Sequence, residues 1–272
     1  MPEYSLTIEM AGLACTVMSP DWALAELVSR RYRGFLSRRS PRFTLTARID
    51  PSAAGDAPCD VVPASATIDW HEHRLHFSGD GYSADYDVTA GTGVMTLPFN
   101  LTPLDLVLKV LYAHYLLDND ACFMHACAVG HPGNVDLFFG PSGSGKSTLA
   151  GLAAQSGAVV LADELVIVRR CLDAFTLYGT PFWGGCNASA DVRGLFALCS
   201  ERWKDAVTAI RPMHALRRLL PCSGNFFHDA VHQSRLFALL GSLAGSTACQ
   251  ALQFSSIPSM RGWLDARLGG IG

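Results

Sequence analysis

Charged residues are scarce in this sequence, and their scarcity excludes several classes of partner. Asp, Glu, Lys and Arg make up 17% of the 272 residues, below the usual quarter, and the net charge is −3. Because positive charge is not in excess, we expect binding neither to nucleic acid nor to a membrane surface. The longest uncharged stretch, residues 236–260, contains Gln250, Gln253 and Pro258, so it is a poor membrane span and indicates a helix followed by a strand.

A secretory signal and a disulfide framework are also missing. The first residues, MPEYS, have neither the basic segment nor the apolar stretch of a signal peptide. The nine cysteines are odd in number, scattered, and free of any Cys-x-x-Cys pair. Reduced thiols of this kind are typical of the cytosol, so we expect a cytoplasmic protein.

Three residues of metal-binding type, Cys122, His125 and Cys127, lie close together in the sequence. If the segment is a strand, His125 and Cys127 share one face and Cys122 points to the other. Three ligands would then not converge on one zinc ion. Buried small residues are the better interpretation, and a zinc site is the alternative.

The chain does contain enough apolar material for a large core. Hydrophobic residues reach 49%, and the length allows one large or two modest domains. We predict an α/β protein in which residues 1–118 form an N-terminal α+β domain of unknown role. Residues 119–272 form the second domain, which carries the motifs described below.

Short alternating segments separated by polar turns characterise the first hundred residues. They predict strands at residues 4–9, 43–49, 66–70, 74–77 and 82–88, and a loop at 50–63. A helical pattern covers residues 22–36, and the chain is basic from Arg30 to Arg39. A solvated helix end is the simpler interpretation of that charge, and a binding patch is the alternative.

A helix that links the two halves is predicted from residue 102 onward. Thr102 can cap the helix, Pro103 suits its first turn, and Asp105 completes an N-terminal pattern that resembles a capping box. Further along, the pattern predicts strands and then a helix stopped by a proline; the strands are at 123–129, 135–139, 158–162 and 165–169, and the helix is at 208–220.

The most informative motif is Gly-Pro-Ser-Gly-Ser-Gly-Lys-Ser-Thr, a full match to the phosphate-binding pattern G-x-x-x-x-G-K-[ST]. An apolar run precedes it and a helical pattern follows it, which is the strand–loop–helix setting that the motif needs. A chance glycine-rich turn is the alternative. The candidate nucleotide-binding residues are Gly140, Pro141, Ser142, Gly143, Ser144, Gly145, Lys146, Ser147 and Thr148.

Phosphate chemistry explains the residue types in this motif. Glycines allow successive backbone N–H groups to turn around phosphate oxygens, and the following helix N-terminus adds partial positive charge. Lys146 is expected to reach the β- and γ-phosphates of ATP, and Ser147 is expected to bind Mg²⁺.

An acidic pair, Asp163 and Glu164, follows the apolar run Val-Val-Leu-Ala. An acid at the end of a strand beside the loop strand can hold Mg²⁺. Because successive strand residues face opposite ways, one acid can bind metal while the other takes a proton from an attacking hydroxyl. Both acids are candidate metal ligands. For Glu164 the alternative is a solvated strand end.

Two further features bear on the site. His125, on a strand ahead of the loop, can orient or tune a neighbouring carboxylate, although a lone histidine is more often structural. Residues 178–185 form a shaped turn in which Phe182 and Trp183 are costly to expose, so the turn either lines a pocket or is a packing corner. Leu-Ser-Gly-Gly-Gln and Asn-Lys-x-Asp are absent, which argues against a transporter-type ATPase and a standard GTPase.

Taken together, His125-Ala-Cys-Ala-Val, the glycine loop, and Leu161-Ala-Asp-Glu-Leu-Val resemble the catalytic domain of HPr serine kinase/phosphorylase. That family has a P-loop fold of the phosphoenolpyruvate-carboxykinase-like type. The resemblance covers residues 120–260. Its motifs are specific for the family when they occur together, and each is a weak indication by itself. Residues 179–184 look more like divergent HPr-kinase-like proteins, which often accompany peptide-maturation genes.

The resemblance implies a role for four residues. Asp163 would be the catalytic base with His125 beside it, Lys146 the phosphate clamp, and Ser147 a metal ligand. The chain departs from the family where Glu164 replaces the second Asp. It also lacks the family's signature for binding HPr, which puts HPr as substrate, and the reverse phosphorolysis, in doubt.

The expected function is that of a kinase using ATP and Mg²⁺ to phosphorylate a hydroxyl, most often serine, on a peptide or small protein. The alternative is a non-catalytic ATP-binding partner of a peptide-modifying enzyme. Relatives form hexamers, so the resemblance points to a homo-oligomer without fixing its size. A preference for ATP over GTP is left open.

Overall fold

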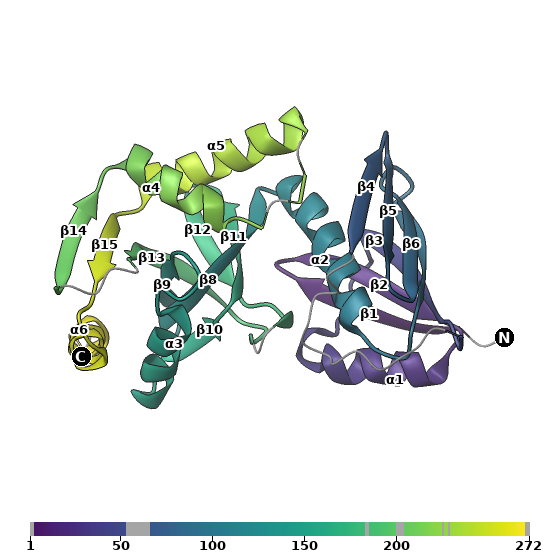
Figure 1. Ribbon diagram of the computed structural model, residues 1–272, viewed down its shortest axis with the longest axis horizontal. Coiled ribbons are helices and arrows are strands. Elements are labelled where there is room, and N and C mark those ends of the chain that lie inside the picture. Colours follow the sequence, from purple (N-terminus) through teal and green to yellow (C-terminus); the bar gives the residue numbers. More distant parts are fainter. Residues whose placement is uncertain are drawn as a thin grey trace. The chain divides into compact units, whose positions relative to one another are not determined.

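The computed structural model describes residues 3–52, 66–182, 185–199, 204–224, 226–227 and 229–269. The chain forms two compact units, Met1–Tyr112 and Ala113–Gly272, each with its own sheet (Figure 1). The boundary lies inside helix α2 (Thr102–Leu117), between residues 112 and 113, whereas the sequence suggested one between 118 and 119. No helix in the described ranges combines the length and apolar character needed to cross a bilayer.

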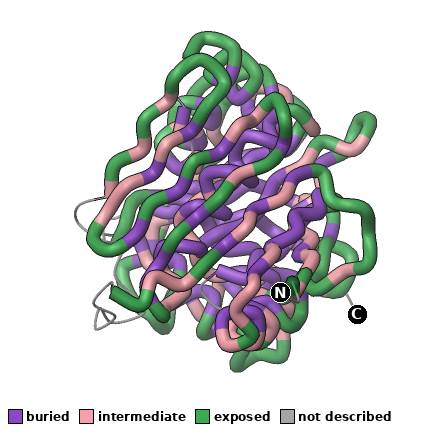
Figure 2. Tube along the Cα trace, turned by 90° about the vertical axis from the view of Figure 1, so that its right-hand side faces the viewer, coloured by how far each residue is buried: buried purple, intermediate pink, exposed green. Residues whose placement is uncertain are grey.

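The first unit is a seven-stranded mixed sheet with the strand order β1-β2-β3-β7-β6-β5-β4. Buried residues alternate with partly buried ones along β3 and with exposed ones along β6, so one face of the sheet is apolar (Figure 2). The five strands predicted here are confirmed, and the sequence missed β2 and β7. Its elements are β1 (Tyr4–Met10), β2 (Leu13–Ser19), α1 (Trp22–Arg31), η1 (Arg33–Phe35), β3 (Phe43–Ile49), β4 (Thr67–His71), β5 (Arg74–Gly79), β6 (Tyr82–Asp87) and β7 (Thr92–Leu97). Most of the predicted loop at 50–63 lies outside the described residues.

Three of the five arginines between Arg30 and Arg39 form ion pairs within this unit. Arg30 pairs with Glu26 one turn earlier, Arg31 pairs with Asp105 on α2 at 2.7 Å, and Arg39 lies 3.4 Å from Glu9. These ion pairs favour the structural interpretation of the basic segment over a binding patch.

Helix α2 begins at Thr102, as predicted. The side-chain oxygen of Asn100 accepts a hydrogen bond from the backbone N–H of Thr102 at 3.0 Å. Asp105, expected to belong to the helix start, accepts a hydrogen bond from the hydroxyl of Tyr32 as well as from Arg31. The carboxylate therefore ties α2 to the end of α1.

The second unit carries an eight-stranded sheet and the remaining helices. Its elements are β8 (Ala121–His131), β9 (Asn134–Phe139), α3 (Lys146–Gln155), β10 (Val159–Ala162), β11 (Leu165–Cys171), β12 (Ala174–Tyr178), β13 (Ser189–Leu198), β14 (Ala206–Ile210), α4 (Pro212–Leu219), η3 (Leu220–Cys222), α5 (Ala230–Ser246), β15 (Cys249–Gln253) and α6 (Ile257–Gly269). The predicted strands around the loop, β8 to β11, are confirmed.

Strand pairing in this unit closes on itself. The long strand β8 pairs with β11 through its first half and with β9 through its second half. Strand β9 pairs with β13, β13 with β12, and β12 with β11. These five strands thus form a closed circuit of hydrogen-bonded ladders, and β10, β15 and β14 extend it on either side.

Alternate residues of β8 and β9 point into two different cores. One core contains Met124 and Leu137 and is covered by α4 and α5; the other contains Cys127 and Phe138 and is covered by α3 and α6. Cys122 belongs to the first core, so it and Cys127 face opposite ways, as the strand geometry predicted. In the described part of the chain, no three His, Cys, Asp or Glu side chains are arranged to hold a metal.

The helix predicted at residues 208–220 is wrong at its start. Thr208 and Ile210 belong to strand β14, which pairs antiparallel with β15, and α4 begins only at Pro212. β-branched side chains suit a strand, and proline suits the first position of a helix. Pairing with β15 therefore outweighs the helical pattern in this short segment.

A buried charge cluster joins β9, β13 and α6. The carboxylate of Asp136 is 1% exposed and accepts hydrogen bonds from the guanidinium groups of Arg193 and Arg267. Arg267 also lies over the ring of Phe196, 5.1 Å from its centroid. Its contact with Asp136 raises the pKa of the Arg267 side chain. The cluster fixes α6 against the sheet.

Two buried histidines connect α2 with α5. Asp229, the N-cap of α5, lies 2.6 Å from His232 Nδ1, and His232 Nε2 lies 2.9 Å from His114 Nδ1. The carboxylate accepts from His232, so His232 Nε2 accepts from the Nδ1–H of His114. The ring of Phe227 stacks on His232 at 4.7 Å.

We predict that this pair makes the protein less stable in mild acid. Burial, and then the charges of His232 and Arg235, lower the pKa of His114 from 6.5 to about 4, while Asp118 and Asp229 act in the opposite direction. The unfolded chain therefore binds more protons between these values, and the free energy of unfolding should fall as pH drops from about 6.5 to 4, by at most about 3 kcal/mol. Urea unfolding across this range tests the prediction.

His114→Gln should flatten that pH dependence, whereas His73→Gln, at a histidine whose side chain is 48% exposed, should leave it unchanged. Equal slopes in the wild type and His114→Gln would show that other groups govern the acid sensitivity.

Candidate functional site

The loop between β9 and α3 contains glycines in a backbone conformation that other residues rarely adopt. Gly143 and Gly145 adopt φ angles of +74° and +103°, a region that residues with a Cβ enter only with strain. At Gly140, a Cβ would lie 2.6 Å from the carbonyl oxygen of Leu198, so the loop packs closely against the end of β13. Helix α3 begins at Lys146, and the first N–H groups of a helix have no intrahelical partner.

Lys146 is buried at the start of α3, with 5% of its surface exposed. Its Nζ donates hydrogen bonds to the carbonyl oxygens of Gly140 and Pro141, at 3.0 and 3.1 Å. Among the described residues no carboxylate forms an ion pair with it. The ammonium group is thus held across the loop by neutral oxygens, which leaves its charge available to an anion.

Asp163 follows β10 and faces the first turn of α3. It forms a side-chain hydrogen bond with Ser147, while its Oδ1 is buried without a hydrogen-bond partner. Burial raises the pKa of this carboxyl and the charge of Glu164 adds to the effect, whereas Ser147, Lys146 and His125 oppose it. A buried carboxylate oxygen without a donor indicates a site for a cation.

His125 and Glu164 form a second pair beside the loop. Strand register places Leu165 opposite His125, which brings the preceding Glu164 next to the imidazole. His125 Nδ1 lies 3.1 Å from the carbonyl oxygen of Glu164 and 3.6 Å from its Oε2. Because Nδ1 faces oxygens, it carries the proton in the neutral ring, and Nε2 keeps its lone pair.

The resemblance implied that His125 lies beside Asp163, and that expectation stays a prediction. The hydrogen bond of His125 goes to the carbonyl oxygen of Glu164. His125 affects Asp163 through its charge, as the smallest of the contributions to the pKa of that carboxyl. Both members of the new pair are about 40% exposed, so both are accessible to a ligand.

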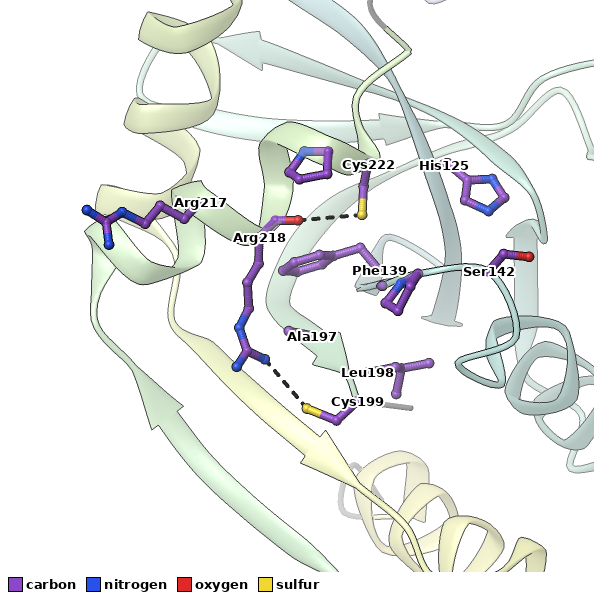
Figure 3. Close-up of a pocket in the computed structure, with 12 residues that line it drawn as sticks. His125, Phe139, Ser142, Ala197, Leu198, Cys199, Arg217, Arg218 and Cys222 are labelled. Carbon is purple, nitrogen blue, oxygen red and sulfur yellow. Dashed lines mark hydrogen bonds between the residues drawn. The ribbon is translucent and has the colours of Figure 1, made fainter. Parts of the chain in front are cut away.

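A cavity of about 610 Å³ opens beside the loop (Figure 3). Figure 3 shows His125 and Ser142 on one side of it and Arg218 on the other. Its apolar wall comes from the ends of β9 and β13. The lining residues are His125, Phe139, Gly140, Pro141, Ser142, Ala197, Leu198, Cys199, Arg217, Arg218, Pro221 and Cys222.

The sequence did not single out the far wall of this cavity. Arg218 Nη1 donates to Cys199 Sγ at 3.5 Å, and the Cys222 thiol donates to the carbonyl oxygen of Arg218 at 3.5 Å. Burial raises the pKa of the Cys222 thiol. The signal that could have found Arg217 and Arg218 is their helical spacing from the apolar Leu216 and Leu219, which mark the opposite face of α4.

The turn at residues 178–185 favours the interpretation as a packing corner. Phe182 is 1% exposed and meets Phe123 edge-on, with ring centroids 6.4 Å apart. The hydroxyl of Thr180 donates to the carbonyl oxygen of Leu165 at 2.8 Å. None of these residues lines the cavity beside the loop. Trp183, which completes this prediction, lies outside the described residues.

Comparisons with known proteins add little to this geometry. No protein-family model matches the chain, and no curated protein matches it either. Among solved structures, the chain is similar to the Hpr(Ser) kinase/phosphatase from Coxiella burnetii, with 9% identity and a TM-score of 0.31. The alignment covers 53% of this chain and 94% of that one. A similarity this weak carries no functional argument, so function has to be inferred from the chain's own residues.

Proposed function

We propose that this protein is an ATP-dependent kinase that transfers the γ-phosphate to a hydroxyl, most often of serine, on a peptide or small protein. The observation that carries the proposal is that His125 and the start of the glycine loop line one cavity. Lys146 donates hydrogen bonds to the loop carbonyls, Ser147 at the start of α3 contacts Asp163, and Glu164 lies beside His125. These groups together can serve both the binding of ATP and the transfer of its γ-phosphate.

The loop and Lys146 bind the phosphates. Left-handed glycines turn backbone N–H groups toward the phosphate oxygens, and the N-terminus of α3 favours negative charge. Lys146 exchanges its loop carbonyls for phosphate oxygens and stabilises the charge that spreads over the γ-phosphoryl group during transfer. Lys146 thereby neutralises part of the negative charge of the phosphate groups.

The residues present fit Mg²⁺. Ser147 and Asp163 would hold it, since they contact each other and Asp163 Oδ1 is buried without a donor. Held there, the ion would neutralise part of the negative charge of the phosphate groups. Glu164, the third candidate ligand from the sequence, is directed to His125 and is assigned below to proton transfer.

The acceptor hydroxyl must lose its proton as its oxygen attacks the γ-phosphorus. The bond from that phosphorus to the bridging oxygen breaks, and ADP leaves with the electron pair. His125 lines the cavity with a free Nε2, and Glu164 stabilises the imidazolium that forms when Nε2 accepts the proton. The resemblance instead implies Asp163 as the base, and the two assignments predict different mutant behaviour.

A non-catalytic ATP-binding partner of a peptide-modifying enzyme is the competing function. The test is incubation of the full chain with γ-labelled ATP, Mg²⁺ and a serine peptide encoded beside its own gene. Label on the peptide supports the kinase. Tight ATP binding without transfer to that peptide or to a panel of other serine peptides would overturn it in favour of the binding partner.

Lys146→Ala should weaken ATP binding by about tenfold or more, because one of the phosphate's charged donors is lost. Calorimetric titration measures the affinity. Lys109→Ala, in the other unit, is the matched control and should bind ATP as the wild type does. Equal affinity in the Lys146 variant would contradict the assignment of the loop.

A further inference from the structure

Helix α4 carries a basic face that the proposed kinase reaction does not use. Arg211, His214, Arg217 and Arg218 are all exposed. Positions three, six and seven residues after Arg211 return to the same side of a helix, and Ala215, Leu216 and Leu219 are buried on the other side. We call these four exposed residues the α4 basic face.

The charge of this face is not neutralised within the described structure. None of its arginines forms an ion pair with a carboxylate there, and the hydrogen bond of Arg218 goes to the sulfur of Cys199. Arginines elsewhere in the same unit behave differently: Arg170 pairs with Asp120, and Arg235 with Asp118. Exposed positive charge without internal partners, on a chain of net charge −3, favours an acidic ligand.

A groove of about 500 Å³ runs between α4 and β14, next to this face. Arg217 and Arg218 line both the groove and the cavity beside the phosphate loop. The two spaces therefore adjoin each other at these two side chains. Among the described residues, no Phe, Tyr or Trp lines the groove; the described lining residues are Thr208, Ala209, Ile210, Arg211, His214, Arg217, Arg218 and Ala251.

Strand β14, which lines this groove, also has an edge that can offer main-chain hydrogen bonds. It pairs with β15 on one side and is the last strand of the sheet in the part of the chain that the structure describes (Figure 1). Val207, Thr208 and Ala209 are exposed. An edge of this kind can accept a further strand, which is a common way to bind an extended peptide.

We propose that the α4 basic face and the β14 edge dock an acidic, extended segment of the phosphoacceptor, which adds to β14 as a strand. Its carboxylates pair with Arg211, Arg217 and Arg218, and the side chain that carries the hydroxyl enters the cavity. An extended peptide fits better than single-stranded nucleic acid, because the described lining of the groove offers no aromatic ring on which bases could stack. This inference rests on the proposed kinase function and specifies its acceptor.

Binding of labelled peptides to the full chain, measured by fluorescence anisotropy without nucleotide, tests the docking. The probe is a synthetic peptide with one serine between alternating glutamates. One comparison peptide has glutamine in place of glutamate, another has alternate backbone amides N-methylated, and a thymidine oligonucleotide of equal length is the third. The glutamate peptide should bind most tightly, more weakly at high salt, and N-methylation of the strand-pairing edge should abolish its binding.

Arg217→Glu/Arg218→Glu should lower affinity for the glutamate peptide by at least about tenfold, since two attractive charges become repulsive. Arg261→Glu, a charge reversal on α6, should leave it unchanged. Because the α4 arginines are exposed, both variants should keep the wild-type Tm. Any one of four results would overturn the proposal. The glutamate peptide does not bind, or the glutamine or N-methylated peptide binds equally well. Alternatively, the double variant keeps the wild-type affinity, or the oligonucleotide binds more tightly than the glutamate peptide.

Phosphoryl transfer separates this inference from the function on which it rests. If the glutamate peptide docks but never receives label from ATP, docking stands and the kinase proposal fails for that acceptor class. If the glutamine peptide is phosphorylated as efficiently as the glutamate peptide, the kinase proposal stands and the docking proposal fails.

Discussion

Glu164→Gln should lower the rate of phosphoryl transfer by about 10²–10⁴-fold, the usual contribution of a positioned proton acceptor. The glutamine keeps the shape beside His125 but loses the charge that stabilises an imidazolium 3.6 Å away. Because Glu164 is not expected to contact the nucleotide, affinity for Mg-ATP should stay near the wild-type value. Single-turnover transfer of labelled phosphate and calorimetric titration measure the two quantities.

Asp163→Asn is the matched comparison, since it makes the same acid-to-amide change one residue away. If Asp163 and Ser147 hold Mg²⁺, this variant should need a higher Mg²⁺ concentration for half-maximal ATP binding and should lose rate as a consequence. The opposite pattern would contradict our assignment: normal Mg-ATP affinity with lost transfer in Asp163→Asn, and a wild-type rate in Glu164→Gln. Asp163 would then be the base that the resemblance implies.

Asp136→Asn should reduce the free energy of unfolding by about 3–5 kcal/mol, because it leaves two partly buried guanidinium groups without their counter-charge. Asp120→Asn removes the partner of Arg170 at a site where the carboxylate side chain is 59% exposed, and it should cost less than about 1 kcal/mol. Urea denaturation of both variants measures the difference. Losses of similar size would show that the Asp136 cluster does not stabilise the fold as a buried charge cluster should.

Local features of the fold could be predicted from the sequence, and long-range pairings could not. Alternating apolar residues identified strands β3 and β6, and the glycine loop identified the junction of β9 and α3, because both signals lie within a few residues. The sequence pattern assigned residues 208–210 to a helix, because a run of three residues is too short to distinguish the periodicity of a helix from the alternation of a strand. Only its register with β15, which is distant in sequence, makes it a strand.

The candidate site shows the same division. Residue types and spacing were enough to single out Lys146, Ser147 and Asp163, which lie together around the loop. The partner of His125 depends on which residue of β11 lies opposite it, and that register places Glu164 in contact. The basic face of α4 depends on where the helix begins, and the sequence predicted a start at 208 rather than at Pro212.

The closed circuit of strands has a consequence for how the site moves. Strands β8, β9, β11, β12 and β13 are each hydrogen-bonded on both sides, so none can detach unless two ladders break together. Amide protons of β8 and β11 should therefore exchange with deuterium only through global unfolding, whereas those of β14, paired on one side, should exchange through local opening. The groups assigned to proton transfer sit on the slowly exchanging frame, and the surface assigned to the acceptor lies on the part free to adjust.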